Sequence, residues 1–277
     1  MKIRWRNTSS NLIINETGML KYLHYYKIYW ISFKSKLLLY SQRNKYLNNF
    51  SKFQTLFTCK KGLEIGGPSS LFSNQLLPVY HIAKEIDGCN FSNSTIWEGN
   101  IISEDYNYLT NKKGKQIIAE GMDLSGIGNE QYDFILSCHN LEHIANPLKA
   151  LNEWLRIVKK GGSIMLVLPD KRFTFDRKRD YTQFAHLIED FNNNIDESDM
   201  THLEEILRLH DLDLDPVVSK DFEAFKARCE NNIENRCLHQ HVYSPNLLKE
   251  IFEHLNIKVV SQYFIPPIHQ IIVGIKQ

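Results

Sequence analysis

The feature that most constrains the fold is an alternation of short apolar runs with helical stretches that begins after Lys60. This alternation is typical of a parallel sheet whose strands are joined by crossover helices. A helix is predicted over residues 147–159, because Leu148, Leu151 and Leu155 share one face and two glycines follow. Five apolar runs are predicted to be strands of one sheet: residues 62–65, 80–86, 116–119, 132–137 and 163–168.

The end of the chain returns to the same pattern after an interruption. Two apolar runs, residues 257–263 and 270–275, follow a predicted helix over residues 246–255. Because only a short turn joins these two runs, they must pair antiparallel. The interruption, residues 170–246, is rich in His, Arg and acidic residues and holds shorter helical segments such as residues 200–209. We interpret it as an insertion or cap.

The N-terminal segment is a basic arm. Residues 1–60 hold eleven Lys or Arg and one acid, Glu16. Over residues 16–48 apolar side chains recur every three or four positions, which is typical of amphipathic helices. We favour packing of their aromatic face on the main domain; a second interpretation is that the lysine-rich face contacts anionic lipid. We therefore divide the chain into an arm, residues 1–60, and one domain, residues 61–277.

Composition indicates an intracellular protein. The five cysteines are odd in number, widely spaced and without a Cys-x-x-Cys pair, so neither a disulfide framework nor a zinc ribbon is indicated. Lysines interrupt the most apolar stretch, and the N-terminus carries no secretory signal pattern. We expect a cytoplasmic location, at the inner face of the membrane if the arm binds lipid.

A glycine-rich turn follows the first predicted strand. The strand holds Glu64 and runs into Gly66, Gly67 and Pro68. Glycines at this place let the backbone approach a ligand, and the next helix offers unpaired N–H groups, so a nucleotide-like ligand is indicated. The alternative is a tight turn that needs glycine for steric reasons alone.

Polar residues also end the later predicted strands. Glu85 and Asp87 end the second strand, where a carboxylate can accept both ribose hydroxyls, and we favour Asp87. Asp123 follows the third strand, where it could accept the amine of an adenine. The fourth strand runs into a polar peptide that contains His139 and His143.

With these motifs, residues 61–169 resemble the class I S-adenosylmethionine-dependent methyltransferases of small-molecule type. The most specific part is residues 132–169, which includes Leu141, Glu142 and His143. The resemblance implies a Rossmann-like, mostly parallel seven-stranded sheet with an antiparallel C-terminal strand. N-terminal helices and a helical insertion after strand five would be added to this α/β fold. It also implies S-adenosylmethionine as the cofactor.

The resemblance assigns cofactor contacts residue by residue. They are Glu64, Gly66, Gly67 and Pro68 in the loop, Asp87 at the ribose, Asp123 and Leu124 at the adenine, and His139 near the sulfonium. The family's loop carries a third glycine where this chain has Pro68, which leaves the loop's shape open. Proline is suited to the first turn of a helix, so the change is tolerable.

Catalysis requires alignment of acceptor, methyl group and sulfur, and a base only if the acceptor is a hydroxyl. His143 is the first candidate for this base, and the others are His139, His239, His241 and Asp176. For each histidine, a hydrogen-bonded structural role is the alternative.

The insertion is similar to that of bacterial methyltransferases of surface-polysaccharide and nucleotide-sugar pathways, which implies a sugar or sugar-phosphate acceptor. Lys171 and Arg172 would suit an anionic group on it. His186, His202 and Glu205 are further candidates for acceptor binding. We predict no resident metal, although His202 and Glu205 share a helical face that could hold one together with a further ligand.

Three other classes of function are less well supported. The first is a NAD(P)-dependent oxidoreductase, which would also use a glycine loop and a ribose acid, but whose loop has a third glycine. The second is a non-catalytic membrane-surface adaptor, which would use the arm and a ligand-binding domain. The third is a nucleic-acid methyltransferase, but nucleic acid is not an expected partner because the main domain is acidic.

Overall fold

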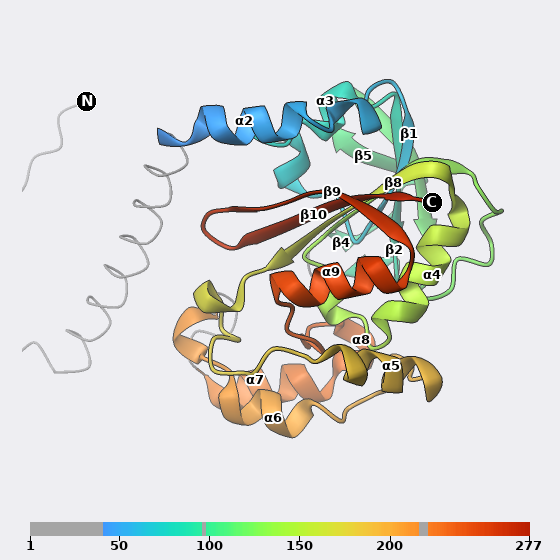
Figure 1. Ribbon diagram of the computed structural model, residues 1–277. Helices are drawn as coiled ribbons and strands as arrows, with labels where there is room; N and C mark the ends of the chain where they lie inside the picture. The colour runs from blue at the N-terminus through green and yellow to red at the C-terminus, as the bar shows by residue number, and fades with distance from the viewer. Residues whose placement is uncertain (1–40, 96–97, 216–220) are drawn as a thin grey trace, which may run out of the picture.

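The computed structural model describes residues 41–95, 98–215 and 221–277, which form one eight-stranded sheet covered by helices (Figure 1). In the order in which they pair, the strands are β5, β6, β2, β1, β7, β8, β10 and β9. Their bounds are β1 Lys61–Ile65, β2 Glu85–Asn90, β5 Asp105–Leu109, β6 Lys112–Ile118, β7 Tyr132–Cys138, β8 Val158–Pro169, β9 Ile257–Ile265 and β10 His269–Lys276. A separate two-stranded ribbon consists of β3 Ser94–Thr95 and β4 Gly99–Asn100.

The helices lie between these strands and after β8. The α-helices are α2 Arg43–Ser51, α3 Val79–Ile82, α4 Pro147–Ile157, α5 Phe184–Asn192, α6 Leu203–Leu209, α7 Phe222–Glu230, α8 Asn232–Asn235 and α9 Pro245–His254. Short 3₁₀ helices are η1 Gln54–Leu56, η2 Ser70–Ser73, η3 Leu141–His143, η4 Lys171–Phe173 and η5 Leu212–Leu214.

The strand order confirms the predicted fold. Strands β6, β2, β1, β7 and β8 are parallel, and β10 pairs antiparallel with both β8 and β9. The chain moves outward from β1 through β2 to β6 and then returns to β7 on the other side of β1. This reversal is a topological switch point, where open α/β sheets bind ligands beyond the carboxyl ends of their strands.

One strand of the large sheet was not predicted from the sequence, nor was the β3–β4 ribbon. Strand β5 pairs antiparallel with β6 at the edge of the sheet. Its residues alternate between exposed and buried, with Tyr106 and Tyr108 turned inward. The sheet therefore has eight strands where seven were expected.

Apolar side chains cover both faces of the sheet. On one face, Ile65 and Ile135 join a core cluster with residues of α4, α5 and α9. On the other face, Phe134 and Leu136 join a cluster with residues of α2, η1, η2 and α3. Figure 1 shows α4 and α9 on the opposite side of the sheet from α2 and α3. Burial on both faces explains why the central strands appear in the sequence as continuous apolar runs.

Helix α4 shows how closely the sequence specifies a local structure. Asn146 caps it by accepting a hydrogen bond from the Lys149 N–H at 3.1 Å, and Pro147 occupies its first turn. Trp154 is fully buried, and its indole N–H donates to the Gly121 carbonyl at 2.8 Å. The helix thereby fixes the segment that follows β6.

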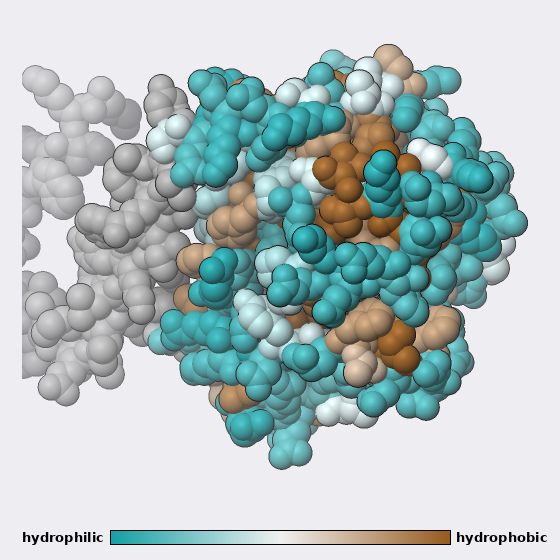
Figure 2. All heavy atoms as spheres, viewed as in Figure 1, coloured by the Kyte–Doolittle hydropathy of each residue, from teal (hydrophilic) through white to brown (hydrophobic). Residues whose placement is uncertain are grey.

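The insertion after β8 folds as a cap at the end of the sheet where β8 terminates (Figure 1). It contains η4, α5, α6, η5, α7 and α8. Its own small core consists of Ile206, Phe225, Cys229 and Leu238. In the view of Figure 2 its surface is mostly hydrophilic, whereas hydrophobic side chains gather over the region where β8, β9 and β10 run together.

Residues just before β1 pack into the domain. Tyr46, Phe50, Phe53 and Phe57 are all buried in the core cluster of the α2 face, so the packed domain begins before residue 61. Most of the helix predicted over residues 16–48 lies outside the described residues. Of the helices in the described part of the chain, none combines the length and the apolar character that crossing a membrane requires.

The strand predicted over residues 80–86 was wrong in both its limits. Helix α3 takes the apolar residues Val79–Ile82, and β2 begins only at Glu85. The strand then continues through Gly88 and Cys89 to Asn90, because its position between β1 and β6 buries even these small or polar residues. The polar residue at the carboxyl end of β2 is therefore Asn90, three positions beyond the predicted Asp87.

Candidate active site

The glycine loop lies at the switch point, between the ends of β1 and β7. Gly66 has φ of 78°, and its N–H donates to the Cys89 carbonyl at 2.9 Å. A Cβ added to Gly66 would lie 2.5 Å from Nδ2 of Asn140, which follows β7. Only glycine satisfies both the backbone conformation and this close approach. The loop therefore needs Gly66 for its own shape as well as for ligand access.

Glu64 supports this loop from beneath. It is fully buried and accepts hydrogen bonds from the hydroxyls of Tyr80 at 2.5 Å and Tyr106 at 2.8 Å and from the Ser69 N–H at 3.0 Å. Burial raises the pKa of Glu64 to about 7, against the lowering effect of these donors. Glu64 thus holds Gly67 and Pro68 in place from below, whereas Pro68 itself lines the cavity above.

Asp87 is not placed to bind a ribose. It is buried, accepts hydrogen bonds from the Lys115 N–H at 2.8 Å and the Tyr132 hydroxyl at 2.9 Å, and lies 2.9 Å from the Lys61 amine. Lys61 and Tyr132 begin β1 and β7, so the carboxylate faces the amino ends of the strands. The sequence-based assignment of Asp87 depended on a strand that ended there, and that strand end was wrong.

An inner chamber lies beyond the carboxyl ends of β1, β2 and β6. Glu120 pairs with Arg236 at 2.7 Å, and the Arg236 guanidinium lies 5.0 Å from the centre of the Phe91 ring. The chamber is lined by Ile65, Gly66, Cys89, Phe91, Ala119, Glu120, Gly121, Asn140, His143, Ile144, Glu197 and Arg236. It combines a flat aromatic surface and apolar walls with a carboxylate.

Asp123 and Leu124, the predicted adenine contacts, do not line this chamber. Asp123 is exposed and lines a separate surface hollow with Lys149 and Arg156. Leu124 is fully buried in the core. Because β6 ends at Ile118, the first acid after it is Glu120, and that residue lines the chamber instead.

A larger outer cavity of about 640 Å³ opens from the inner chamber and lies between the glycine loop and the cap. It has the volume of a small-molecule site. The two spaces share Gly66, Asn140, His143 and Arg236. The other lining residues are Pro68, Ser69, Ser70, Leu71, Asn74, Glu98, Cys138, His139, Phe175, Asp215, Arg228, Cys237, His239, Ile268 and His269.

A histidine–aspartate pair forms part of this cavity. Nδ1 of His239 contacts Oδ2 of Asp176, and the guanidinium of Arg179 donates to Oδ1 of Asp176 at 3.0 Å. Burial lowers the pKa of His239, but the Asp176 carboxylate more than offsets this and raises it above 6.5. Burial alone would raise the pKa of Asp176, whereas His239 and Arg179 lower it to about 2. With Nδ1 held by a carboxylate, Nε2 of His239 is the ring nitrogen left for chemistry.

His143 and Glu142 adjoin this pair. Nδ1 of His143 lies 3.0 Å from the Leu238 carbonyl, which can only accept, so Nδ1 carries the proton. Its ring meets that of His239 edge to face at 4.6 Å. Glu142 is buried, burial raises its pKa to about 7, and neither of its oxygens has a hydrogen-bond donor among the described residues. Burial lowers the pKa of His143 to about 3, which disfavours His143, the first candidate from the sequence, as the base. His239 and Glu142 are the groups of this cluster whose pKa values are raised.

His139 also lines the outer cavity, at the end of β7. Its Nε2 lies 2.9 Å from Nδ1 of His269, which begins β10, and its Nδ1 lies 3.8 Å from Glu142. Burial and three neighbouring histidines lower the pKa of His139 to about 3. The ring is therefore neutral at the position predicted to face the sulfonium.

The basic residues predicted to bind an anionic acceptor make local contacts instead. Arg172 is paired with Asp170, with a shortest distance of 2.6 Å, and Lys171 donates to the Arg179 carbonyl. Neither lines the outer cavity, which has Arg228 and Arg236 in their place. Sequence reasoning missed both arginines, because no motif surrounds them and only the folding of the cap brings them to the site.

The remaining candidates gather elsewhere in the cap. His241 is buried, and its Nε2 donates to the Ala145 carbonyl at 3.2 Å. It lies beside His186 and His202, with Glu205 4.0 Å from His202. None of these four residues lines the outer cavity.

The strand order, the glycine loop at the switch point and the two joined spaces define the class I methyltransferase fold. Residues 22–262 match the family described as methyltransferase domain, and the chain belongs to this family. It therefore carries a methyltransferase domain, a class of domain whose cofactor is S-adenosylmethionine, as the sequence predicted.

Individual relatives are more distant. An uncharacterized protein of Methanocaldococcus jannaschii is 38% identical over 71 residues, which are 25% of this chain and 34% of that protein. The match thus spans about a third of the relative's length. A methyltransferase of Aquifex aeolicus has 13% identity over 88% of this chain and 97% of its own, with a TM-score of 0.45. One of Mesorhizobium loti has 8% identity over 83% and 100%, with a TM-score of 0.47. Because both scores are below 0.5, the fold assignment rests on the strand order.

The inner chamber has a volume of about 30 Å³ in this structure, so its residues fit the adenosyl part of S-adenosylmethionine only after the chamber widens. A Cβ on Gly67 would lie 2.5 Å from a Glu64 oxygen, so glycine is required there for the loop to pack on Glu64. In the inner chamber, Phe91 and Ile144 offer apolar surface to a flat base, and Glu120 offers an acceptor to an amine or hydroxyl. Since Arg236 lies against Phe91 and Glu120, an adenosyl group bound there requires this guanidinium to shift.

Proposed function

We propose that the protein O-methylates a sugar, sugar-phosphate or nucleotide-linked intermediate of surface-polysaccharide biosynthesis, with His239 as the general base. The observation that carries this proposal is the Asp176–His239 pair at the wall of the outer cavity. A hydroxyl is a poor nucleophile until its proton is accepted, whereas many nitrogen acceptors need no such group. A carboxylate-oriented imidazole therefore favours a hydroxyl acceptor.

Each residue has a defined task in this proposal. Bound S-adenosylmethionine supplies an electrophilic methyl group on a positively charged sulfur. His239 accepts the acceptor's hydroxyl proton at Nε2, and Asp176 holds the ring through Nδ1 and stabilises the imidazolium that results. Arg179 fixes Asp176 in turn. Since transfer requires an in-line arrangement, the walls of the cavity would supply most of the rate enhancement by orienting the acceptor.

The lining of the outer cavity supports a polar, anionic acceptor. It offers hydroxyl and amide side chains from Ser69, Ser70 and Asn74 and two guanidinium groups. Arg228 is paired with Asp215 at 2.6 Å and Arg236 with Glu120 at 2.7 Å, so an anionic acceptor would bind to their remaining N–H groups or exchange with these carboxylates. Guanidinium groups bind phosphates and carboxylates in a bidentate manner. A cavity of about 640 Å³ is large enough for a sugar and a phosphate beside the donor's methyl group.

The test is methyl transfer to a panel of nucleotide sugars and sugar phosphates, measured as release of S-adenosylhomocysteine and as a mass gain on the acceptor. His239→Gln should abolish transfer and still bind the donor. His254→Gln, which changes an exposed histidine of α9, should leave turnover unchanged. Transfer to nitrogen acceptors alone, or full turnover by His239→Gln, would refute the proposal.

We also propose that the part of the basic arm before the packed domain, residues 1–40, brings the enzyme to the inner face of the membrane. Seven basic residues against one acid support attraction to anionic lipid. Co-sedimentation with phosphatidylserine vesicles should be lost when residues 1–40 are removed. Equal binding by both chains would refute this role.

A further inference from the structure

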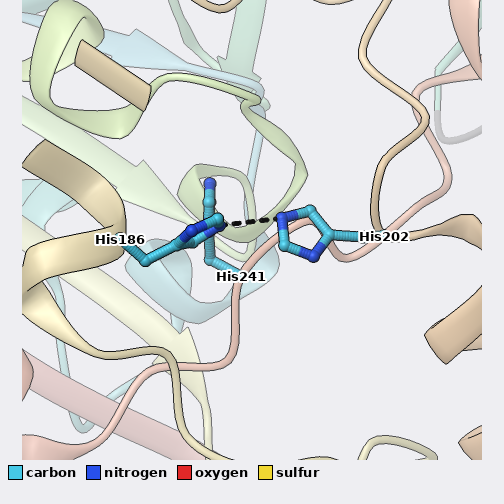
Figure 3. Close-up of side chains that lie close together, drawn as sticks. All are labelled: His186, His202 and His241. Atoms are coloured by element: carbon cyan, nitrogen blue, oxygen red, sulfur yellow. Dashed lines mark hydrogen bonds between the residues drawn. The ribbon is translucent and has the colours of Figure 1, made fainter. Parts of the chain in front are cut away.

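Three histidines of the cap meet at one point although they are far apart in the sequence. His186 lies on α5, His202 directly precedes α6, and His241 lies in the segment between α8 and α9. Nε2 of His186 is 3.1 Å from Nε2 of His202 (Figure 3). One ring nitrogen from each of the three lies within 4.8 Å of the others. Figure 3 shows the three rings converging from separate segments of the chain.

A carboxylate completes the group. Asp190 lies one turn after His186 on α5, and its Oδ2 is 3.5 Å from Nε2 of His186 and 3.8 Å from Nε2 of His241. This oxygen is buried and has no hydrogen-bond partner among the described residues. The same holds for Nδ1 of His241, a residue that is 1% exposed. Burial of unpaired polar atoms is unfavourable, so two such atoms in neighbouring residues of one cluster point to a missing ligand.

The spacing of these groups matches that around a tetrahedral metal ion. With bonds of about 2.0–2.1 Å, neighbouring ligands of tetrahedral zinc lie about 3.3 Å apart. The contacts of His186 with His202 at 3.1 Å and with Asp190 at 3.5 Å are close to this value. Imidazole and carboxylate are also the donors that divalent transition metals accept. In addition, Nε2 of His241 donates to the Ala145 carbonyl, and metal-bound histidines commonly hold their second nitrogen in this way.

We propose that His186, His202, His241 and Asp190 bind one divalent transition metal ion, with Zn²⁺ as the preferred ion. Four protein ligands leave no open position, which is typical of a structural site. None of the four lines the outer cavity or the inner chamber. The ion would join α5, the start of α6 and the segment after α8, and so fix the cap over the cavity.

The location gives this ion a role in the site. His239 is two residues before His241 on the same segment, and the Asn146 amide donates to the Asp190 carbonyl at 2.9 Å. The ion would therefore tie the segment that carries His239 to the start of α4. The proposed metal site does not depend on the identity of the methyl acceptor. It is tested by the metal content of the purified protein and not by methyl transfer.

The first experiment is elemental analysis by inductively coupled plasma mass spectrometry of the full chain, purified without a histidine tag or a metal column. We expect about one zinc per chain, retained by His254→Gln and lost from His186→Gln. The two variants differ from the native chain in the same way, since each replaces a histidine of a helix by glutamine. A metal-free native chain that also fails to bind added Zn²⁺ in a calorimetric titration would overturn the proposal.

A ligand exchange tests the location without relying on the stability of a deletion. In His202→Cys the thiolate can replace the imidazole, so the Co²⁺-loaded variant should gain a thiolate-to-cobalt charge-transfer band that the native chain lacks. Absence of this band in a variant that still binds Co²⁺ would place the ion elsewhere. Loss of the metal from His143→Gln together with its retention in His186→Gln would move the site to Glu142, His143 and His239, and would likewise overturn the proposal.

Removal of the metal should also loosen the cap. Removal of the metal from the native chain with a chelator should lower its Tm by roughly 5–10 °C. After the chelator is removed, addition of one equivalent of Zn²⁺ should restore the Tm. The Tm of His186→Gln should not respond to the chelator. A native Tm that is unchanged by complete removal of zinc would refute the structural role.

Discussion

Replacement of Glu120, just after β6, should weaken donor binding, whereas replacement of the nearby Asp123 should not. Glu120 lines the inner chamber and pairs with Arg236, whose guanidinium lies 5.0 Å from the centre of the Phe91 ring. Asp123, three residues later, is exposed in a separate hollow. We therefore expect Glu120→Gln to weaken binding of S-adenosylhomocysteine and Asp123→Asn to leave it unchanged.

The magnitude follows from the surroundings of Glu120. A hydrogen bond to a charged acceptor contributes about 1.5–3 kcal/mol. Because the Glu120 side chain is 39% exposed, water screens the interaction and the lower value applies. Loss of about 1.5 kcal/mol corresponds to roughly a tenfold weaker dissociation constant. The isosteric glutamine keeps the volume of the side chain, so the effect reports the charge alone.

Calorimetric titration of the two variants and the native chain provides the assay, with circular dichroism as the control for folding. Both variants remove one negative charge within four residues of sequence, so a general electrostatic effect would appear in both. A tenfold loss in Asp123→Asn with none in Glu120→Gln would refute the placement of the adenosyl group in the inner chamber.

Three further results are expected. Asp176→Asn should lower kcat about 100-fold or more and leave donor affinity intact, because His239 loses its orientation; a fall in donor affinity without a fall in kcat would contradict this. Gly66→Ala should weaken donor binding by tenfold or more, since its Cβ would meet Asn140 at 2.5 Å and its φ is 78°; unchanged affinity in titration would show that the loop does not contact the donor. The folded state raises the pKa of Glu64 from 4.5 to about 7, so Glu64 holds a proton more tightly than in the unfolded chain and stability falls as pH rises from about 4.5 through 7. Glu64 contributes about 3 kcal/mol of unfolding free energy to this fall, and denaturant titrations at pH 5 and 8.5 should show a loss of stability that is smaller by about this amount in Glu64→Gln than in the native chain, since Glu142 and Glu197 titrate in both; the same loss in both chains would contradict the assignment.

The sequence predicted those parts of the fold whose signals are local. The amphipathic face of α4, with Asn146 and Pro147 at its start, is complete within eleven residues. Strands β1, β7 and β10 are apolar runs with few exposed residues. The short turn between the last two strands predicted their antiparallel pairing, which the structure confirms.

Predictions from the sequence were wrong where residues without apolar side chains are buried by tertiary packing. The end of β2 is Gly88, Cys89 and Asn90, which carry no apolar signal and are buried because the strand lies between β1 and β6. Three further residues of strand move the carboxyl end of β2 from Asp87 to Asn90, whose amide donates to the Gly67 carbonyl. At β6, the acid that lines the inner chamber is Glu120 and not Asp123.

The chemistry of the cap depends on contacts that no local pattern encodes. Asp176 and His239 are 63 positions apart. Arg236 reaches Glu120 across 116 positions. His202 and His241 stand in different segments, and the sequence indicated only the pairing of His202 with Glu205. These groups meet because the cap folds over the carboxyl edge of the sheet, and that arrangement is a property of the whole domain.

The central claim is that the glycine loop and the inner chamber bind S-adenosylmethionine. The most direct test is calorimetric titration of the purified chain with S-adenosylmethionine and S-adenosylhomocysteine, with NADH as the control ligand. We predict saturable binding of both adenosyl compounds at one site per chain and no binding of NADH. Binding of NADH alone, or of none of the three, would contradict the account.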